Sequence, residues 1–599
     1  MLTLSAMLIA AVSISYSRSI RHITRPCPAD DRFGVTRPRA LVALVLITAA
    51  GAALRFYNLA WGAPYYHFHM DEHYVLNGAD MLRKSAATAA GSFKFFMYSP
   101  LPMYLVNIAR SLYGMLRHPL ELTSPRDEVT YMVLGRAISA AFGTATIPVA
   151  YAIATRVAGR VAGLLAAAYL AFAVIHLRDS HFFSVDISMT FFCMLTWLAL
   201  LRLAERGTLV EGVSTGAAFA GALLCKYSAS FLALPVALAY VVSPGRPRGL
   251  RPVSAWVGWA ARALVPVITC VATFLALDPL VVRYYDRFRE DVRTQITEPL
   301  TGATRPVFFG HFADLGSPRW YWFTNLLWWG VGPTLELWSL AGLVWLVTRR
   351  SRAALLSAAV PIAYFAVAGN SVAPFVRYAI PLATALTVAA GVLSADLIGR
   401  ARWRPLAMVA TLIVLTTTAL WALAYMNVFR SPDSRVAASY WLLENVPADA
   451  RVLVEPTQNT PPMGSYLTQA NFYKNYVMFY PETERHDYYR LYALDTYRSL
   501  YNRGVSDEWR RNYIRSRLAL ADWIVMDDTY IQWYEHLPSP DHDVMKQYYR
   551  DLFAGNLGFD LVKTFKVYPA IFGREINDDG AELSFRLFDH PRIFIFKRR

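Results

Sequence analysis

Charged residues are scarce in this chain of 599 residues: aspartate, glutamate, lysine and arginine together make up 17% of it, and hydrophobic residues 55%. So apolar a composition, in so long a chain, excludes a single soluble domain. Cysteine is also rare, since three of the four cysteines (Cys193, Cys225, Cys270) fall in apolar runs and Cys27 lies in a basic stretch. Their spacing fits neither a metal motif nor a disulfide framework. The composition therefore indicates a polytopic membrane protein.

Acidic residues are depleted mainly in the hydrophobic part of the chain. Residues 1–426 carry 37 Lys and Arg against 20 Asp and Glu, whereas residues 427–599 carry 22 against 23. The basic excess is therefore typical of the cytoplasmic loops of a membrane protein, and no nucleic-acid partner is expected. The chain also lacks any Asn-x-Ser/Thr acceptor and has far more arginine than lysine, which favours a bacterial inner membrane.

Eleven apolar runs of roughly 17–25 residues are long enough to cross a ~30 Å hydrocarbon core. They predict a mainly α-helical polytopic membrane bundle of about 11–12 transmembrane helices. Residues 1–17 are apolar but short for a span, and they fit an extra helix, an uncleaved signal-like segment or a mistaken start site. The eleven runs are residues 40–57, 131–155, 161–177, 183–201, 211–226, 228–243, 255–277, 325–347, 353–369, 376–398 and 405–426.

Basic residues occur in every second connection between these runs. If the basic segment 18–39 is cytoplasmic, the positive-inside rule requires this alternation, and it puts Asp71, the loop 279–324 and all residues after 427 on the outer face. We therefore expect an N-terminal segment (1–39), a transmembrane domain (40–426) with long outer loops at 58–130 and 279–324, and an outer domain (427–599). The basic connections contain Arg156 and Arg160, Arg202 and Arg206, Arg246, Arg248 and Arg251, Arg349, Arg350 and Arg352, and Arg400, Arg402 and Arg404.

Residues 427–599 predict a separate, extracytoplasmic α/β domain. Asp527 and Asp528 follow one of its strands, where acidic side chains usually cap a turn, although they could also bind a cation. No motif in this part of the sequence is catalytic, so we assign the domain to acceptor recognition or partner docking. Its expected elements are a helix at Arg435–Asn445, strands at Arg451–Glu455 and Trp523–Met526, and closing strands near 561–568, 583–588 and 592–597.

The stretch from His67 to His73 places two adjacent carboxylates, Asp71 and Glu72, among three imidazoles. Such groups in an outer loop can take a proton from a hydroxyl or hold a cation. His69, Asp71 and His73 are candidate metal ligands, but their spacing matches no metalloprotease helix motif. A loosely bound divalent cation and an ordinary solvated loop are the alternative interpretations.

Two basic positions on the outer side stand out because the positive-inside bias removes most others. Lys226 interrupts two apolar runs, and Arg377-Tyr378 begins a span after the charge-free loop 369–375. A charge at a membrane boundary is costly and by default functional. The partner that fits both residues best is a lipid phosphate, and snorkelling to ordinary headgroups is the alternative.

Asp186 lies in the outer third of its span, after Arg178 and His181, where an unpaired carboxylate would be costly. We expect it to face the bundle interior. It could form a structural ion pair with Arg136 or Arg178, or it could orient the site, and Arg136 carries the same two interpretations.

Together these residues resemble the lipid-linked-sugar-dependent glycosyltransferases of the GT-C fold, in particular the protein O-mannosyltransferases and the aminoarabinose transferase of lipid A. The resemblance covers about residues 1–430, and its most specific element is Asp71-Glu72, which matches the acidic pair in the first outer loop of those families. The supporting elements are Pro100-Leu101-Pro102, Arg136 through Gly143-Thr144, Ser180 through Asp186 with Phe191-Phe192, Gly221 through Lys226-Tyr227, and Arg377-Tyr378 with Pro381.

The resemblance implies a polyprenyl-phosphate sugar donor and direct transfer, with inversion, to a protein, lipid or glycan acceptor. Asp71 would be the general base, and Glu72 would orient Asp71 or the acceptor. Lys226 and Arg377, with Tyr378, would bind the donor phosphate and stabilise its developing charge.

The chain also departs from both relatives. The aminoarabinose transferases carry an acidic and a basic residue before the first-loop prolines, whereas this chain has Tyr98-Ser99, which argues against their metal site and their sugar. The protein O-mannosyltransferases carry an inserted sugar-binding module, for which the loop 279–324 is too short.

Three other functions fit parts of the sequence. One is a glycosyltransferase with a diphosphate-linked oligosaccharide donor, and another is a non-catalytic scaffold. The third is a secondary transporter of about twelve spans, which would explain the apolar bundle and its buried charges. Against transport stand the long first outer loop (58–130) and the large terminal domain.

Overall fold

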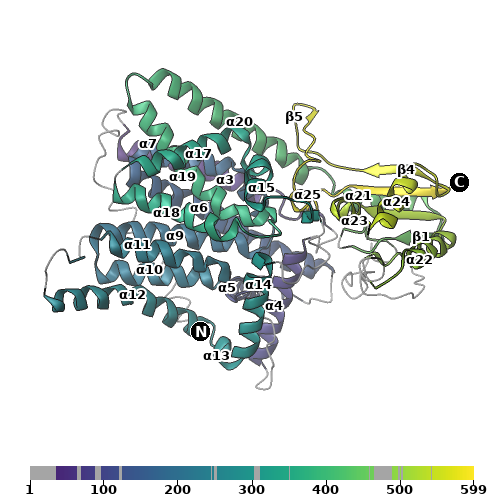
Figure 1. Ribbon diagram of the computed structural model, residues 1–599, viewed down its shortest axis with the longest axis horizontal. Helices are drawn as coiled ribbons and strands as arrows, with labels where there is room; N and C mark the ends of the chain where they lie inside the picture. The colour runs from purple at the N-terminus through teal and green to yellow at the C-terminus, as the bar shows by residue number, and fades with distance from the viewer. Residues whose placement is uncertain are drawn as a thin grey trace.

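Figure 1 shows a helical bundle with a smaller domain at one end, made by the C-terminal part of the chain. It is a computed structural model. The structure describes residues 35–63, 69–87, 96, 98–120, 125–243, 246–247, 252–301, 311–349, 351–457, 459–463, 489–496, 500, 504–540 and 542–599.

Each of the eleven apolar runs forms one to three consecutive helices. Six helices are long and apolar enough to cross a membrane. A seventh span results if the helical segments Pro318–Val331 and Pro333–Thr348, which meet at 120°, are counted as one. Four more apolar helices are shorter, with 10–17 residues. The six or seven candidate spans confirm the predicted polytopic helical bundle. Its elements are α3 (Arg37–Phe56), α6 (Pro125–Ala158), α7 (Arg160–Phe172), α8 (Val174–Asp179), α9 (Val185–Arg206), α10 (Leu209–Leu223), η1 (Tyr227–Leu232), α11 (Ala233–Val241), α12 (Val253–Leu277), α15 (Pro318–Tyr321), η3 (Trp322–Leu326), α16 (Leu327–Val331), α17 (Pro333–Thr348), α18 (Arg352–Ala368), η4 (Val376–Ala379), α19 (Ile380–Gly399) and α20 (Arg404–Arg430).

Helices α7, α9 and α19 form the centre of the bundle. Small side chains let α7 and α19 approach closely, since a Cβ at Gly391 would lie 2.6 Å from the carbonyl oxygen of Ala162. Close approach through small residues is how membrane helices gain packing without a hydrophobic driving force. The peripheral helices α3, α12 and α20 instead expose apolar side chains such as Val45, Val257 and Leu412, as expected of surfaces that face lipid.

The basic connections lie together at one end of the bundle. Arg156 forms an ion pair of 2.7 Å with Glu205, and Arg349 pairs with Asp396 and donates to the carbonyl of Val157. Residues from several connections are therefore in contact at the end away from the C-terminal domain (Figure 1). This arrangement agrees with the alternation of charge along the sequence.

Four helices from the two long loops pack beside the bundle: α4 (Met70–Ala87), α5 (Leu101–Leu116), α13 (Leu280–Arg283) and α14 (Tyr285–Thr301). They share an apolar cluster that includes Val75, Met103 and Val281. Asp71 and Glu72 fall in the first turn of α4, where the helix dipole favours negative charge. The two carboxylates are therefore presented by a helix end and not by an open loop.

The C-terminal domain contains a five-stranded mixed sheet in the order β2-β1-β3-β7-β4, with β1, β2 and β3 parallel. The predicted α/β domain is thus confirmed as a fold. The boundary expected at 426/427 falls inside α20. The elements are α21 (Ser434–Asn445), β1 (Arg451–Val454), β2 (Arg490–Ala493), α22 (Asp507–Leu520), β3 (Trp523–Asp527), α23 (Thr529–His536), α24 (Asp543–Phe553), β4 (Phe559–Phe565), β5 (Ala570–Ile571), β6 (Arg574–Glu575), α25 (Leu583–Arg586) and β7 (Ile593–Arg598).

Two expectations for this domain have clear outcomes. The strand expected at 583–588 is wrong, because these residues form the short helix α25, capped by the Glu582 carboxylate, which accepts from the Ser584 N–H at 2.9 Å. Asp527 does cap the turn after β3, since it accepts from the Thr529 N–H at 2.8 Å. Its neighbour Asp528 pairs with Arg586 and Arg592.

Candidate active site

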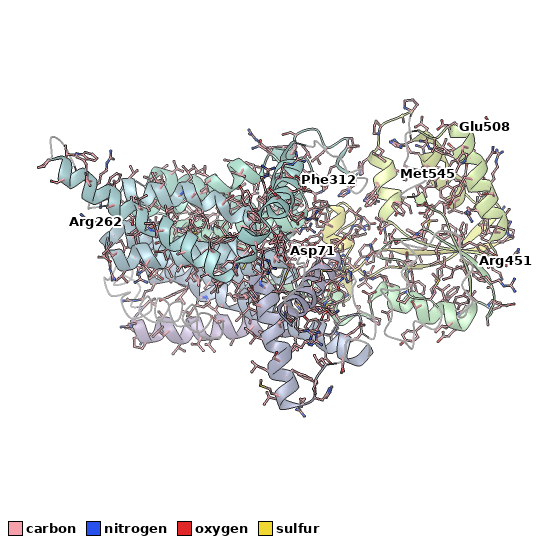
Figure 2. The ribbon with its side chains drawn as sticks, turned by 90° about the horizontal axis from the view of Figure 1, so that it is seen from below. Asp71, Arg262, Phe312, Arg451, Glu508 and Met545 are labelled. Atoms are coloured by element: carbon pink, nitrogen blue, oxygen red, sulfur yellow. The ribbon has the colours of Figure 1, made fainter. Side chains whose placement is uncertain are left out.

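Asp71 lies at the junction between the bundle and the C-terminal domain (Figure 2). Its side chain is buried, and each carboxylate oxygen has a partner from a different segment of the chain. Arg377 Nη1 lies 2.9 Å from one oxygen, and the Tyr98 hydroxyl donates to the other at 2.7 Å. Three segments far apart in sequence therefore meet at this carboxylate.

The surroundings of Asp71 keep it ionised. Burial alone would raise the pKa of the carboxyl group, but Arg377, the Tyr98 hydrogen bond and Lys226 together hold this pKa below its usual value of 3.8. Burial, reinforced by the negative charge of Asp71, raises the pKa of Tyr98 far above 10, so the phenol remains a neutral donor. The resting site thus contains a carboxylate anion held by one cation and one hydroxyl.

His69 supports Asp71 from the residue before the helix. Its Nδ1 accepts the backbone N–H of Asp71 at 3.2 Å, and its ring lies between Phe182 and Phe588, with centroid distances of 4.5 and 4.2 Å. Burial lowers the pKa of His69 to about 3. A neutral imidazole with Nδ1 occupied as an acceptor orients the first turn of α4 in this structure.

Lys226 and Arg377 both lie next to Tyr378. Lys226 Nζ is 5.0 Å from the centre of the Tyr378 ring, and the Arg377 guanidinium is 5.6 Å from it. Lys226 also forms an ion pair of 2.9 Å with Asp186. The expected pairing of Asp186 with Arg136 or Arg178 is therefore wrong, because its cationic partner is Lys226, between α10 and η1. The structure brings together Asp71, Lys226, Arg377, Tyr378 and Asp186.

Glu72 has an environment unlike that of Asp71. It is fully buried and forms a two-point ion pair with Arg136, at 2.8 and 3.0 Å, and it also accepts the Phe183 N–H at 2.8 Å. Arg136 in turn donates to the carbonyls of Leu59 and Trp61. This pair ties α4 to α6 and to the start of the first loop.

Arg178 and His181 have partners other than Asp71. Arg178 pairs with Asp179 at 3.1 Å and with Asp589 at 3.0 Å. The His181 ring stacks on Phe429 with 3.9 Å between centroids, and its Nδ1 lies 3.0 Å from the carbonyl of Leu177. Both residues therefore join elements around the site without touching Asp71 in the contacts that the structure describes.

Of the three candidate metal ligands, His69 and Asp71 lie close together, with 4.0 Å between Nδ1 and Oδ2, but His73 has its partner elsewhere. His73 interacts with Asn77 on the same helix, and burial lowers its pKa to about 3. Within the described part of the chain, no group of three or more His, Cys, Asp and Glu side chains has the geometry of a metal site. His67 falls outside the described residues.

Tyr98 is a site residue that the sequence did not reveal. Its position before Pro100-Leu101-Pro102 stood out only as a departure from related sequences, yet its hydroxyl contacts Asp71 directly. The proline pair could have been the signal, because it begins α5 and fixes the direction from which the preceding residues approach.

Residues 131–272, from α6 to α12, match the family model described as dolichyl-phosphate-mannose-protein mannosyltransferase. The predicted resemblance to these glycosyltransferases is confirmed. The matched residues include Arg136, Asp186 and Lys226, whereas Asp71 and Arg377 lie outside the match. No curated protein sequence matches the chain significantly.

Solved structures of membrane glycosyltransferases are similar to the chain over much of its length. ArnT from Cupriavidus metallidurans bound to undecaprenyl phosphate is 15% identical, with a TM-score of 0.45, and the match covers 92% of this chain and 97% of that one. The Archaeoglobus fulgidus oligosaccharyltransferase is 13% identical, with a TM-score of 0.48, over 83% of this chain and 71% of that one. The S. cerevisiae Pmt1-Pmt2 complex bound to its sugar donor is 16% identical, with a TM-score of 0.32, over 42% and 34%.

Proposed function

We propose that this protein is an inverting membrane glycosyltransferase that moves one sugar from a polyprenyl-phosphate carrier to an acceptor hydroxyl on the extracytoplasmic side. The observation that carries the proposal is the cluster formed by an ionised carboxylate, Asp71, with Arg377 at 2.9 Å and with Lys226 beside the shared Tyr378. It lies at the end of the bundle opposite the basic connections. The family match over residues 131–272 supports the same chemistry.

In the proposed reaction, Asp71 takes the proton of the acceptor hydroxyl as its oxygen attacks the anomeric carbon of the donor. The bond from that carbon to the lipid phosphate breaks on the opposite face, and the polyprenyl phosphate leaves with the electron pair. Arg377 and Lys226 stabilise the charge that builds up on the leaving phosphate. The proton ends on Asp71 and is returned to water after the product departs.

The resting contacts suggest how the donor prepares the base. Arg377 holds Asp71 in a form that is charged but weakly basic, because its positive charge lowers the pKa of the carboxyl group. A donor phosphate that binds Arg377 shares this guanidinium with Asp71. The pKa of Asp71 then rises toward the value that its buried position favours, and the carboxylate becomes a stronger base in the occupied site.

In this proposal, three residues hold reacting groups in place without contacting the substrate: Glu72, Arg136 and Asp186. Glu72 and Arg136 fix the first turn of α4, and Asp186 fixes the ammonium of Lys226. The acceptor is a protein, a lipid or a glycan, and the C-terminal domain, which adjoins Asp71, is the part of the chain we assign to recognising it or to docking a partner.

The test uses purified wild type and Asp71→Asn in detergent or nanodiscs with a polyprenyl-phosphate-linked sugar. Release of free polyprenyl phosphate by wild type and its loss in Asp71→Asn are expected. Equal release by both proteins would remove Asp71 from the base role. Turnover of only diphosphate-linked oligosaccharides would instead indicate that donor class, and solute uptake into proteoliposomes without sugar transfer would indicate a transporter.

A further inference from the structure

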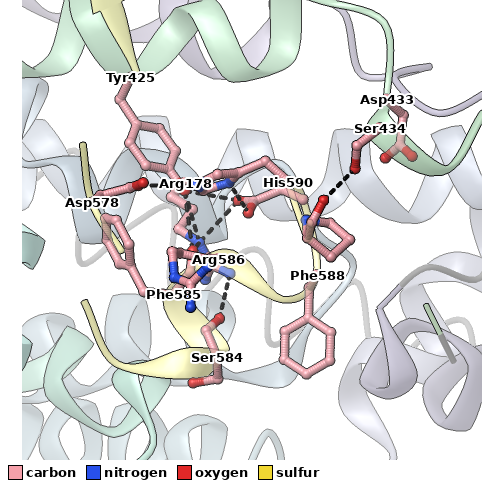
Figure 3. A network of polar contacts seen from close by, with 12 residues as sticks. Arg178, Tyr425, Asp433, Ser434, Asp578, Ser584, Phe585, Arg586, Phe588 and His590 are labelled. Carbon is pink, nitrogen blue, oxygen red and sulfur yellow. Dashed lines mark hydrogen bonds and ion pairs between the residues drawn. The ribbon is translucent and has the colours of Figure 1, made fainter. Parts of the chain in front are cut away.

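One segment of the C-terminal domain, residues 582–590, is inserted against the end of the bundle at the site. We call it the docking segment, and Figure 3 shows part of its network of polar contacts. Its members Glu582, Ser584, Phe585, Asp589 and His590 are all buried. It contains helix α25 and the residues that lead toward β7, so the sheet of the domain and the site are joined by a continuous piece of chain.

The docking segment holds the backbone beside Arg377. Glu582 Oε2 accepts the N–H of Val376 at 3.1 Å, and the Ser584 hydroxyl lies 3.3 Å from the same nitrogen. The other oxygen of Glu582 is 3.0 Å from Nε2 of His311. Because Val376 immediately precedes Arg377, this clamp fixes the backbone from which the guanidinium reaches Asp71.

The same segment also packs against the base. The Phe588 ring lies 4.2 Å from that of His69, whose Nδ1 accepts the N–H of Asp71. Phe588 thus limits where the imidazole can lie, and the imidazole limits where the first turn of α4 can lie. The chain of contacts runs from the C-terminal domain to the catalytic carboxylate through one histidine.

Arg178 fastens the docking segment to the bundle between these two points. It donates to the carbonyls of Ser584 at 2.7 Å and Phe585 at 3.1 Å, and it pairs with Asp589 at 3.0 Å. Figure 3 shows Arg178 among these groups and Tyr425. Since all these groups are buried, a shift of the segment would leave unpaired charges, which resists such motion.

We infer that the docking segment is a positioning element, with Glu582 and Phe588 as positioning residues that set Arg377 and Asp71 relative to each other. This inference rests on the proposed function. A cation that grips the donor and a base that attacks with the acceptor must be held at a defined separation, and a displacement of about 1 Å can cost 100-fold in rate. The C-terminal domain would therefore complete the site as well as adjoin it.

Variants at Glu582 test the donor side of the inference in the full-length protein. Glu582→Ala is expected to weaken the affinity for polyprenyl phosphate, and to raise the KM of the donor, by about tenfold, as for loss of a charge-assisted hydrogen bond. Glu582→Asp keeps the charge but withdraws it by one methylene, so it should resemble Glu582→Ala. Glu582→Gln keeps an oxygen at the original reach and should recover part of the affinity.

Variants at Phe588 test the base side. Phe588→Ala is expected to lower kcat by about tenfold or more, with the dissociation constant of polyprenyl phosphate within about twofold of wild type, because it frees His69 and Asp71 but not Arg377. Phe588→Leu, which retains apolar contact, should recover most of kcat. If both residues only stabilised the fold, the Phe588 variants would not change kcat selectively while the Glu582 variants change donor affinity.

The matched control is Glu455→Ala. Glu455 is a buried carboxylate of the same domain that accepts a hydrogen bond from Tyr549 within the domain. Its loss should lower the unfolding midpoint while the kcat and donor KM of the folded protein stay near wild type. The inference is overturned if Glu582→Asp binds polyprenyl phosphate like wild type, or if the Glu582, Phe588 and Glu455 variants change kcat and KM alike. If wild type itself does not use the donor, the proposed function fails before any variant is compared. A failure of the inference alone leaves wild-type turnover intact, so the two failures can be told apart.

Discussion

Asp71 and Glu72 are neighbours in sequence and yet occupy two different kinds of environment. Glu72 faces the bundle interior, where its partner Arg136 has a side chain that is only 2% exposed. Asp71 pairs instead with Arg377, whose side chain is 20% exposed. Consecutive helical residues point about 100° apart, so one acidic pair can serve both as an anchor and as a reactive group. Adjacent charges of one motif therefore need not share a function.

The sharpest way to break this comparison is to neutralise each carboxylate in turn. Asp71→Asn should lower kcat for donor turnover roughly 100- to 10,000-fold, as for loss of a general base. Its unfolding midpoint should fall less than that of Glu72→Gln, because Arg377 can turn toward solvent. Steady-state kinetics and thermal unfolding of both variants provide the test, and a Glu72→Gln protein with the larger kinetic defect at equal folding would reverse the roles.

The second way is to remove the anchor outright. Glu72→Ala leaves Arg136 buried without its carboxylate, and a broken buried ion pair costs about 3–5 kcal/mol of unfolding free energy. The expected result is a lower unfolding midpoint and a smaller yield of folded protein, measured by thermal unfolding in detergent. The double variant Glu72→Leu with Arg136→Met should regain part of the stability, since it leaves no unpaired charge but removes the partners of the Phe183 N–H and of two backbone carbonyls. Persistence of the full loss in the double variant would contradict the anchor role.

The third prediction changes the shape of the Arg377 side chain and keeps its charge. Arg377→Lys keeps a cation but loses the planar fork that can contact Asp71 and a phosphate together. We expect about tenfold weaker binding of polyprenyl phosphate, as for the loss of one charged hydrogen bond. Arg319→Lys is the matched control, because Arg319 donates to Asn370 at 2.9 Å and is not part of the cluster. Equal affinities for Arg377→Lys and wild type would exclude a bidentate contact.

The last prediction concerns pH and the docking segment. Burial disfavours charge on His590, but Asp578 and Asp589 outweigh it and raise the pKa of His590 to about 9 from 6.5. A group whose pKa is raised by folding stabilises the fold fully below its unfolded pKa and loses this contribution as the pH rises through its folded pKa. The unfolding free energy should therefore decline by on the order of 1–3 kcal/mol between pH 6.5 and 9.5.

Thermal unfolding across this pH range measures the effect. His590→Gln should flatten the decline, because it removes the titrating group between the two carboxylates. A wild-type profile as flat as that of the variant would show that the histidine is not charged in the folded protein.

The bundle could be predicted from the lengths of the apolar runs, and Lys226 and Arg377 stood out because basic residues are scarce on one side. That these two residues meet Asp71 was implied by the family resemblance and not by the run lengths. Tyr98 and the Lys226 partner of Asp186 could not be predicted, because they depend on the path of loops and helix ends. The segment 583–588 misled for a different reason. Its alternation of Leu583, Phe585 and Leu587 is typical of a strand, but the whole segment is buried, and the Glu582 cap starts a helix instead.

The contact between Glu582 and Val376 joins residues 206 positions apart. During synthesis, Arg377 leaves the ribosome well before Glu582 has been translated. If the clamp is required, helices that are already inserted form an incomplete enzyme, and the lipid carrier cannot be consumed by a half-made chain. The protein would then become active only when its C-terminal docking segment has folded against the bundle.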